Sequence, residues 1–127
     1  MTIAIGTDIL EIARLKNVYE RQGMKLVERI LTPSEIARFN SIEDEQVSMS
    51  FLAKRWSAKE AIAKALGTGI AKGVGWQNME VVSLPSGVPQ VVLTGQAREV
   101  LIALGGEKVL LSLSDERHYC VAFCCIV

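Results

Sequence analysis

The spacing of apolar residues changes several times along this chain, and each change predicts a different element. Short runs rich in apolar and β-branched residues predict strands at residues 3–9, 78–84, 89–93, 109–114 and 119–127. Helical spacing, bounded by capping residues and glycines, predicts helices at residues 10–22, 33–40, 48–66 and 96–104. A further apolar segment covers residues 26–31, and the polar, acidic residues 41–47 predict a loop.

Two helix boundaries carry strong local signals. Thr32 and Glu35 have the spacing of a capping box, and Pro33 between them suits the first helical position. The long helix is predicted to begin at Ser48 or Ser50, and Gly67 is predicted to end it in a left-handed conformation.

The order of the elements predicts the fold class. Helices and antiparallel hairpins are mixed without a regular strand–helix–strand alternation, which is typical of an α+β fold. We expect a single domain, residues 1–127, in which a mainly antiparallel sheet packs against the long helix. The last strand is nearly all apolar, so we expect both of its faces to be covered.

Composition narrows the function classes. Lys and Arg number 14, and Asp and Glu also number 14, so no bulk charge attracts the chain to nucleic acid or to a membrane. No apolar run approaches the roughly 20 residues of a membrane span, and the start has no signal-peptide pattern. The three cysteines fit buried thiols in a reducing compartment better than disulfides or zinc, which predicts a cytoplasmic protein.

One acid near the start and two charged residues on the long helix suggest phosphate chemistry. Asp8 lies where the first strand is expected to end, and Glu60 and Lys64 lie one turn apart on one helix face. Two carboxylates suit a magnesium ion that also binds substrate phosphates, with the lysine touching the same phosphates. The alternative, which the residues alone favour, is a Glu60–Lys64 ion pair with Asp8 capping the first helix.

A basic stripe on the first helix is a second candidate. Arg14, Val18, Arg21 and Gln22 share a helix face, which Lys25 extends. Such a stripe suits an acidic helical partner, although a solvated surface is the simpler interpretation. His118, the single histidine, is more consistent with a structural or turn role than with catalysis.

Taken together, four segments resemble one known family. Residues 6–12 (GTDILEI) are similar to the opening of the holo-[acyl-carrier-protein] synthases, and residues 51–69 (FLAKRWSAKEAIAKALGTG) are similar to their long-helix signature. Residues 87–89 (GVP) and 112–119 (SLSDERHY) resemble the hairpin and the C-terminal strands of that family. The resemblance spans nearly the whole chain and implies the 4′-phosphopantetheinyl transferase fold.

The resemblance implies a reaction and a set of site residues. The enzyme would transfer 4′-phosphopantetheine from coenzyme A to a serine of apo acyl carrier protein, a step of fatty acid biosynthesis that releases adenosine 3′,5′-bisphosphate. Asp8 and Glu60 would bind magnesium or manganese and, with Lys64, would form the catalytic group. The residues expected to contact coenzyme A are Arg55, Lys64, Gly67 and Pro89, with Arg55 at the 3′-phosphate from the same or a neighbouring subunit.

The resemblance also implies partners and leaves alternatives. Arg14, Arg21 and Gln22 would dock the acyl carrier protein, and the family forms homotrimers with active sites between subunits. Asp115 stands where many members have a histidine, so the contact of that histidine with coenzyme A is not assigned to Asp115. The general base would be either Glu60 or a metal-bound water. The alternatives are a transferase for another carrier domain and a non-catalytic trimeric module that binds a nucleotide or a protein.

Overall fold

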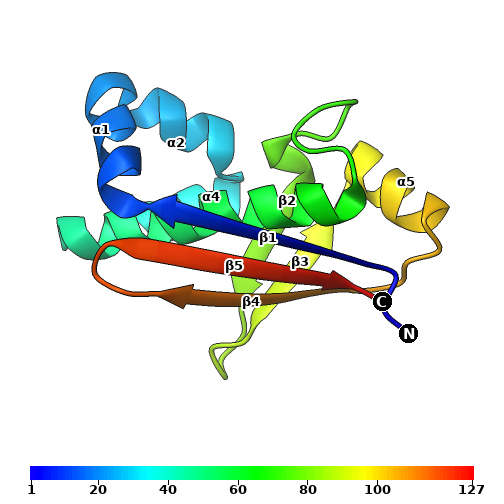
Figure 1. The fold of residues 1–127 in the computed structure, drawn as a ribbon. Coiled ribbons are helices and arrows are strands. Elements are labelled where there is room, and N and C mark those ends of the chain that lie inside the picture. The colour runs from blue at the N-terminus through cyan, green and yellow to red at the C-terminus, as the bar shows by residue number, and fades with distance from the viewer.

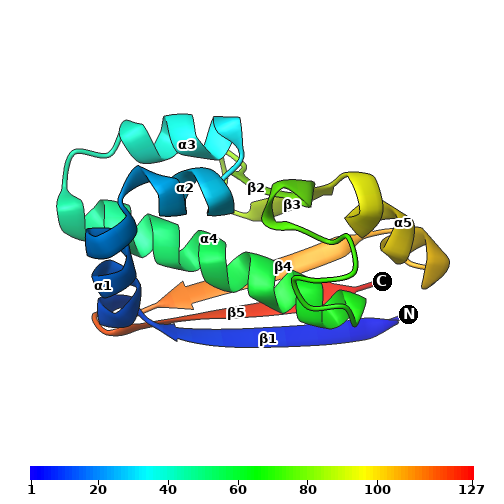
Figure 2. The same cartoon turned by 90° about the horizontal axis from the view of Figure 1, so that it is seen from above.

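The chain is built around one long helix, α4, which has a sheet on one side and shorter helices on the other (Figures 1 and 2). The computed structural model describes all residues, 1–127. The strands are β1 Ala4–Glu11, β2 Met79–Ser83, β3 Pro89–Leu93, β4 Val109–Asp115 and β5 Tyr119–Ile126. The helices are α1 Ile12–Gln22, α2 Met24–Ile30, α3 Pro33–Asn40, α4 Glu45–Leu66, η1 Trp76–Asn78 and α5 Gly95–Ala103.

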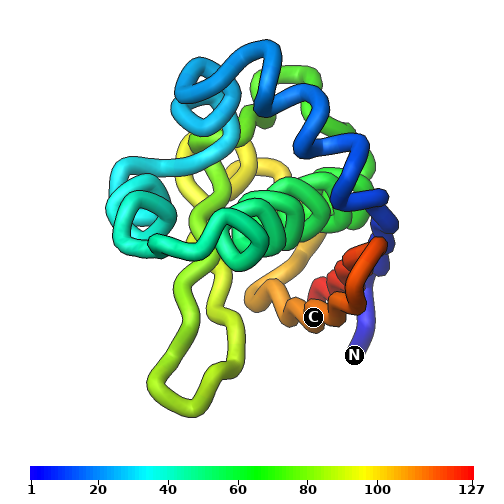
Figure 3. The backbone as a smooth tube through the Cα atoms, turned by 90° about the vertical axis from the view of Figure 1, so that its left-hand side faces the viewer, coloured from blue at the N-terminus to red at the C-terminus, as the bar shows by residue number.

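All strand pairs are antiparallel. The larger sheet has the order β1-β5-β4, and β2 and β3 form a separate hairpin, so the fold is α+β as predicted. In Figure 3, α1 and α2 lie above α4, α3 lies to its left, the three-stranded sheet lies below it, and the β2–β3 hairpin extends downward. None of the helices is both long enough and apolar enough to cross a lipid bilayer.

Helix α4 is buried on nearly all sides because it is rich in small residues. Its C-terminal half packs in one apolar cluster with the sheet and α5, and its N-terminal half packs in a second cluster with α1, α2 and α3. Strand β1 crosses the helix in very close contact at Gly6, where an added Cβ would lie 2.1 Å from the carbonyl oxygen of Ala61. Any larger residue would push the strand away, and with it Asp8, which lies two positions further on.

Several sequence predictions are confirmed. The backbone N–H of Thr32 donates to the Glu35 side chain at 2.8 Å, so α3 begins at the predicted capping box. Gly67 ends α4 with φ +82°. The hairpin lies within one residue of its predicted strands.

Two boundaries were predicted wrongly, and one apolar segment for which no element was predicted is a helix. Strand β1 continues to Glu11, which pairs with Tyr119, so Asp8 lies inside the strand and does not cap α1. The apolar segment at residues 26–31 is the helix α2, whose buried positions follow helical spacing. Helix α4 begins at Glu45, inside the predicted loop, because the Asp44 carboxylate accepts the backbone N–H of Val47 at 3.0 Å.

The outer face of the sheet contradicts the expectation for β5. Alternate β5 residues are buried against α4, but Tyr119, Val121 and Phe123 on the opposite face are 43%, 39% and 44% exposed. Ile5 and Ile9 of β1 extend this exposed apolar surface, at 61% and 65%. Within one chain, therefore, only one face of the last strand is covered.

Candidate active site

Asp8, Glu60 and Lys64 come together where β1 crosses α4. Lys64 Nζ donates to Asp8 Oδ1 at 3.2 Å and to the carbonyl oxygen of Thr7 at 3.0 Å. The close approach of β1 at Gly6 brings this part of the strand onto the helix. The alternative of a Glu60–Lys64 ion pair is wrong, because the ammonium of Lys64 pairs with Asp8.

Asp8 lies close enough to Glu60 to affect the ionisation of the Glu60 carboxyl group. Partial burial raises the pKa of Glu60, the negative charge of Asp8 raises it further, and Lys64 partly offsets the increase. No group of three or more His, Cys, Asp or Glu side chains gathers anywhere in the chain. The donor set is therefore a pair of carboxylates, which fits magnesium, because that ion is commonly held by one or two carboxylates, water and substrate phosphates.

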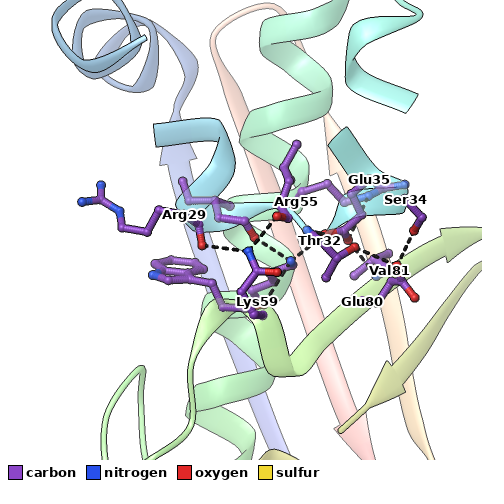
Figure 4. Close-up of polar contacts among 12 residues, drawn as sticks. Arg29, Thr32, Ser34, Glu35, Arg55, Lys59, Glu80 and Val81 are labelled. Carbon is purple, nitrogen blue, oxygen red and sulfur yellow. Dashed lines mark hydrogen bonds and ion pairs between the residues drawn. The ribbon is translucent and has the colours of Figure 1, made fainter. Parts of the chain in front are cut away.

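A second charged cluster lies on another face of α4 and was missed by the sequence analysis (Figure 4). Lys59 is fully buried, and its ammonium donates to Glu35 Oε1 at 2.7 Å, to the carbonyl oxygen of Ile30 at 2.6 Å and to that of Trp76 at 3.2 Å. The other oxygen of Glu35 accepts the backbone N–H of Val81 at 2.8 Å. This pair ties α2, α3, η1 and β2 to α4.

Arg55 is the second cation of this buried cluster. Its Nε lies 4.0 Å from Glu35 Oε2 and has no hydrogen-bond partner, and Nη2 makes a long contact of 3.4 Å with Ser83. The guanidinium carbon lies 4.5 Å from the centre of the Phe51 ring. Burial lowers the pKa of Arg55, and Glu35 only partly offsets this effect. One buried carboxylate thus faces two buried cations.

Two cavities open beside Arg55. One of about 480 Å³ is also lined by Lys54, Arg38 and Arg117, and one of about 370 Å³ is also lined by Ser83 and Arg38. Neither includes Asp8, Glu60 or Lys64. Since Arg55 and Glu60 are five residues apart on α4, their directions differ by about 140°. The structure therefore does not bring Arg55 to the carboxylate pair within one chain.

The remaining predicted site residues lie at the surface. Gly67 is exposed at the C-terminal end of α4, and Pro89 is the first residue of β3. Arg14, Arg21 and Gln22 are exposed on α1, where Gln22 accepts a hydrogen bond from Arg29 at 3.2 Å.

Asp115, which departs from the family pattern, lies at the end of β4, and the single histidine, His118, lies in the turn after it. Asp115 accepts a hydrogen bond from Ser50 at 2.9 Å and lies 3.8 Å from Lys54. His118 is exposed in the β4–β5 turn, where its backbone N–H donates to Glu116 and its carbonyl oxygen accepts the N–H of Ile12. His118 therefore lies in the turn, immediately before the first residue of β5.

Comparison with known proteins identifies the class to which this fold and site belong. A sequence model of the 4′-phosphopantetheinyl transferase superfamily matches residues 4–124. A holo-[acyl-carrier-protein] synthase of Shewanella amazonensis is 48% identical over 120 residues, which is 94% of each chain. The chain belongs to the 4′-phosphopantetheinyl transferase superfamily.

Solved structures agree with this assignment. A holo-[acyl-carrier-protein] synthase of Neisseria meningitidis has a TM-score of 0.91 at 35% identity, covering 100% of this chain and 99% of that one. A holo-[acyl-carrier-protein] synthase of Bacillus anthracis in complex with coenzyme A (3′,5′-ADP) has a TM-score of 0.84 at 31% identity, covering 99% and 96%. The similarity extends over the entire fold.

Proposed function

We propose that this protein is an enzyme that transfers 4′-phosphopantetheine from coenzyme A to a serine of an apo acyl carrier protein. The observation that carries the proposal is the convergence of Asp8, Glu60 and Lys64, from β1 and α4, in a chain of this superfamily. Attack of the serine hydroxyl on the β-phosphorus would release adenosine 3′,5′-bisphosphate. Such a reaction depends mainly on positioning and on stabilising charge.

The carboxylate pair is the proposed metal site. Asp8 and Glu60 would hold magnesium or manganese, and the bound ion would neutralise negative charge on the diphosphate of coenzyme A. Lys64 would contribute a second positive charge to the same oxygens. Either Glu60 or a water molecule at the metal would accept the proton of the serine hydroxyl.

Arg55 is the proposed contact for the 3′-phosphate of coenzyme A. Its buried guanidinium has an unpartnered Nε, and the cluster around it holds one carboxylate for two cations. A phosphate in the adjoining cavity would supply the missing negative charge, and the guanidinium fork suits phosphate oxygens. Gly67 and Pro89 are proposed as further contacts for coenzyme A.

We propose that the active site is completed between copies of the chain in a homotrimer. Arg55 and the carboxylate pair point to different sides of α4, so one coenzyme A molecule would need two chains to reach both. The exposed apolar face of the sheet, formed by Ile5, Ile9, Val121 and Phe123, is a surface that such an assembly would cover. Closed symmetric assembly is the usual way to bury a face of this kind.

The exposed face of α1 is the proposed docking site for the carrier protein. Arg14 and Arg21 are exposed there beside Gln22, so acidic residues of a carrier helix have accessible cationic partners. Arg14→Glu should therefore raise the KM for carrier protein about tenfold or more and leave the KM for coenzyme A unchanged. An equal loss of coenzyme A affinity would contradict docking at this face.

We further propose that the protein acts in the cytoplasm, in fatty acid biosynthesis. Its three cysteines are free thiols, which suits a reducing compartment.

The direct test of the function is a transfer assay. Purified protein is mixed with apo acyl carrier protein, coenzyme A and magnesium chloride, and the carrier is analysed by intact mass spectrometry. We expect a carrier heavier by one phosphopantetheine arm, and no change when EDTA replaces magnesium. A protein that binds coenzyme A but leaves the carrier mass unchanged would instead be a binding module, and modification of a different carrier domain alone would identify another substrate.

A further inference from the structure

The buried carboxylate of Glu35 is saturated with contacts, apart from one side that faces Arg55. Oε1 accepts from Lys59 Nζ at 2.7 Å and from the backbone N–H of Thr32 at 2.8 Å. Oε2 accepts from the backbone N–H of Val81 at 2.8 Å and lies 4.0 Å from Arg55 Nε. The carboxylate is thus fixed by three elements, α3, α4 and β2, and cannot follow a movement of Arg55.

Arg55, by contrast, is held by few direct bonds. A guanidinium has five N–H donors, and the only hydrogen bond to this one is the 3.4 Å contact with Ser83. The ring of Phe51 covers one face of the guanidinium at 4.5 Å, which restricts tilting but does not set rotation in the plane of the ring. Glu35 is the only carboxylate within 4.0 Å of this guanidinium.

We infer that Glu35 is a positioning residue, which holds the Nε side of Arg55 so that its terminal nitrogens face the phosphate cavity. The two-point contact of a guanidinium with a phosphate depends on the orientation of its planar fork. The Nε edge faces Glu35 at 4.0 Å, through charge attraction without a hydrogen bond, so Nη1 and the weakly engaged Nη2 are left for the ligand. This inference rests on the proposed contact between Arg55 and the 3′-phosphate.

Lys59 makes a clean test of this inference feasible. Removing Glu35 alone would leave a buried ammonium without its counter-ion and endanger the fold. Lys59→Met removes that ammonium, and the Glu35 carboxylate keeps the backbone N–H groups of Thr32 and Val81 and the neighbouring charge of Arg55. The double variant Glu35→Gln, Lys59→Met then removes the carboxylate from a protein that already lacks the lysine, so the two variants differ only at the group under test.

The measured quantity is the ratio of kcat/KM for coenzyme A to kcat/KM for 3′-dephospho-coenzyme A. A structural defect lowers both values and leaves the ratio unchanged, whereas misplacement of Arg55 lowers only the value for coenzyme A. We expect the ratio of Lys59→Met to equal that of the wild type, and that of the double variant to fall about tenfold, as loss of an aligned charged contact implies. A double variant with the ratio of Lys59→Met, or a higher one, would overturn the inference.

Two additional measurements keep the outcomes separate. Arg55→Met tests the proposed function: if its ratio equals that of the wild type, the assignment of Arg55 to the 3′-phosphate fails, irrespective of Glu35. Glu35→Asp keeps the carboxylate but shortens the side chain by one methylene, which moves the charge away from Arg55. This variant replaces the double variant if the latter does not fold. We expect it to bind adenosine 3′,5′-bisphosphate more weakly by calorimetry while its affinity for adenosine 5′-monophosphate is unchanged. An equal loss for both ligands would contradict positioning.

Discussion

Helix α4 carries two charged clusters that are chemically alike and physically different. The inner cluster, Glu35 with Lys59 and Arg55, has an ion pair whose side chains are 2% and 0% exposed. The outer cluster, Asp8 with Glu60 and Lys64, has an ion pair whose side chains are 15% and 53% exposed. Water screens the outer pair and is absent from the inner one, so the same kind of contact differs in energy between the two.

This difference in exposure suggests different roles: the inner cluster stabilises the fold, and the outer cluster binds a ligand. The carboxylate of the inner ion pair is matched by a lysine with all three protons donated, which makes that pair a fixed joint between five elements. The outer cluster has two carboxylates, and the pKa of Glu60 is raised first by partial burial and then by repulsion from the charge of Asp8. A cation would relieve that repulsion, so the outer cluster is poised to bind a ligand while the inner one holds the helix still.

The largest effect that separates the clusters should be on stability. Glu35→Gln leaves Lys59 buried without its counter-ion, so we expect the free energy of unfolding to fall by about 3 to 5 kcal/mol. Asp8→Asn removes an exposed pair and should cost less than about 1 kcal/mol. Urea unfolding of both variants beside the wild type tests this contrast, and equal losses would show that the two pairs do not differ in this way.

The next largest effect should be on catalysis, and here the order reverses. Glu60→Gln removes a proposed metal ligand and should slow transfer about a hundredfold or more, which corresponds to about 2.7 kcal/mol. Its stability should not fall, because a raised pKa means that folding disfavours the ionised carboxylate, and glutamine removes that cost. Transfer rates and thermal unfolding are measured together, with the exposed Glu99→Gln on α5 as the control. Wild-type activity in Glu60→Gln would contradict the metal role.

The fold could be predicted from the sequence more completely than the inner charged cluster could, and the reason is physical. Capping at Thr32 and termination at Gly67 depend on neighbours within one turn, so they can be predicted locally. The residues alone favoured a Glu60–Lys64 ion pair with Asp8 as a helix cap, and the family resemblance was needed to prefer Asp8 and Glu60 as a metal-binding pair. No local pattern indicated that Lys59 is buried, because α4 is enclosed by several elements and has no clear polar face.

Glu35 and Asp44 also make contacts that the local sequence pattern did not predict. Glu35 was interpreted only as the end of a capping box, which it is, but its other oxygen bonds β2, far along the chain. Asp44 lies in an acidic run that was predicted to be a loop, yet its Oδ1 accepts the backbone N–H of Val47 and caps the start of α4.

A smaller effect should appear in the pH dependence of the outer cluster. Lys64 lowers the pKa of Glu60, so Lys64→Met should raise it, and the ionised form would then be reached only at higher pH. The acid limb of the pH–rate profile should therefore move to higher pH, and kcat should fall about tenfold as one charged contact to phosphate is lost. Lys64→Arg, which keeps the charge, should leave the acid limb in place. An unmoved limb in Lys64→Met would show that Glu60 does not control it.

The smallest effect belongs to the rim of the inner cluster, at Glu80. Ser34 and Thr32 donate hydrogen bonds to Glu80 and lower its pKa, Ser34 more strongly. A lowered pKa in the folded state stabilises the protein above the unfolded value, near pH 4.5, and the contribution is lost as the pH falls through the folded value. Ser34→Ala should thus reduce the free energy of unfolding by about 0.5 kcal/mol at pH 7 and by less at pH 3.5. Urea unfolding at both pH values measures this, with Ser86→Ala in the hairpin turn as the control. A difference that is the same at both pH values would show that Ser34 acts on Glu80 without regard to its charge.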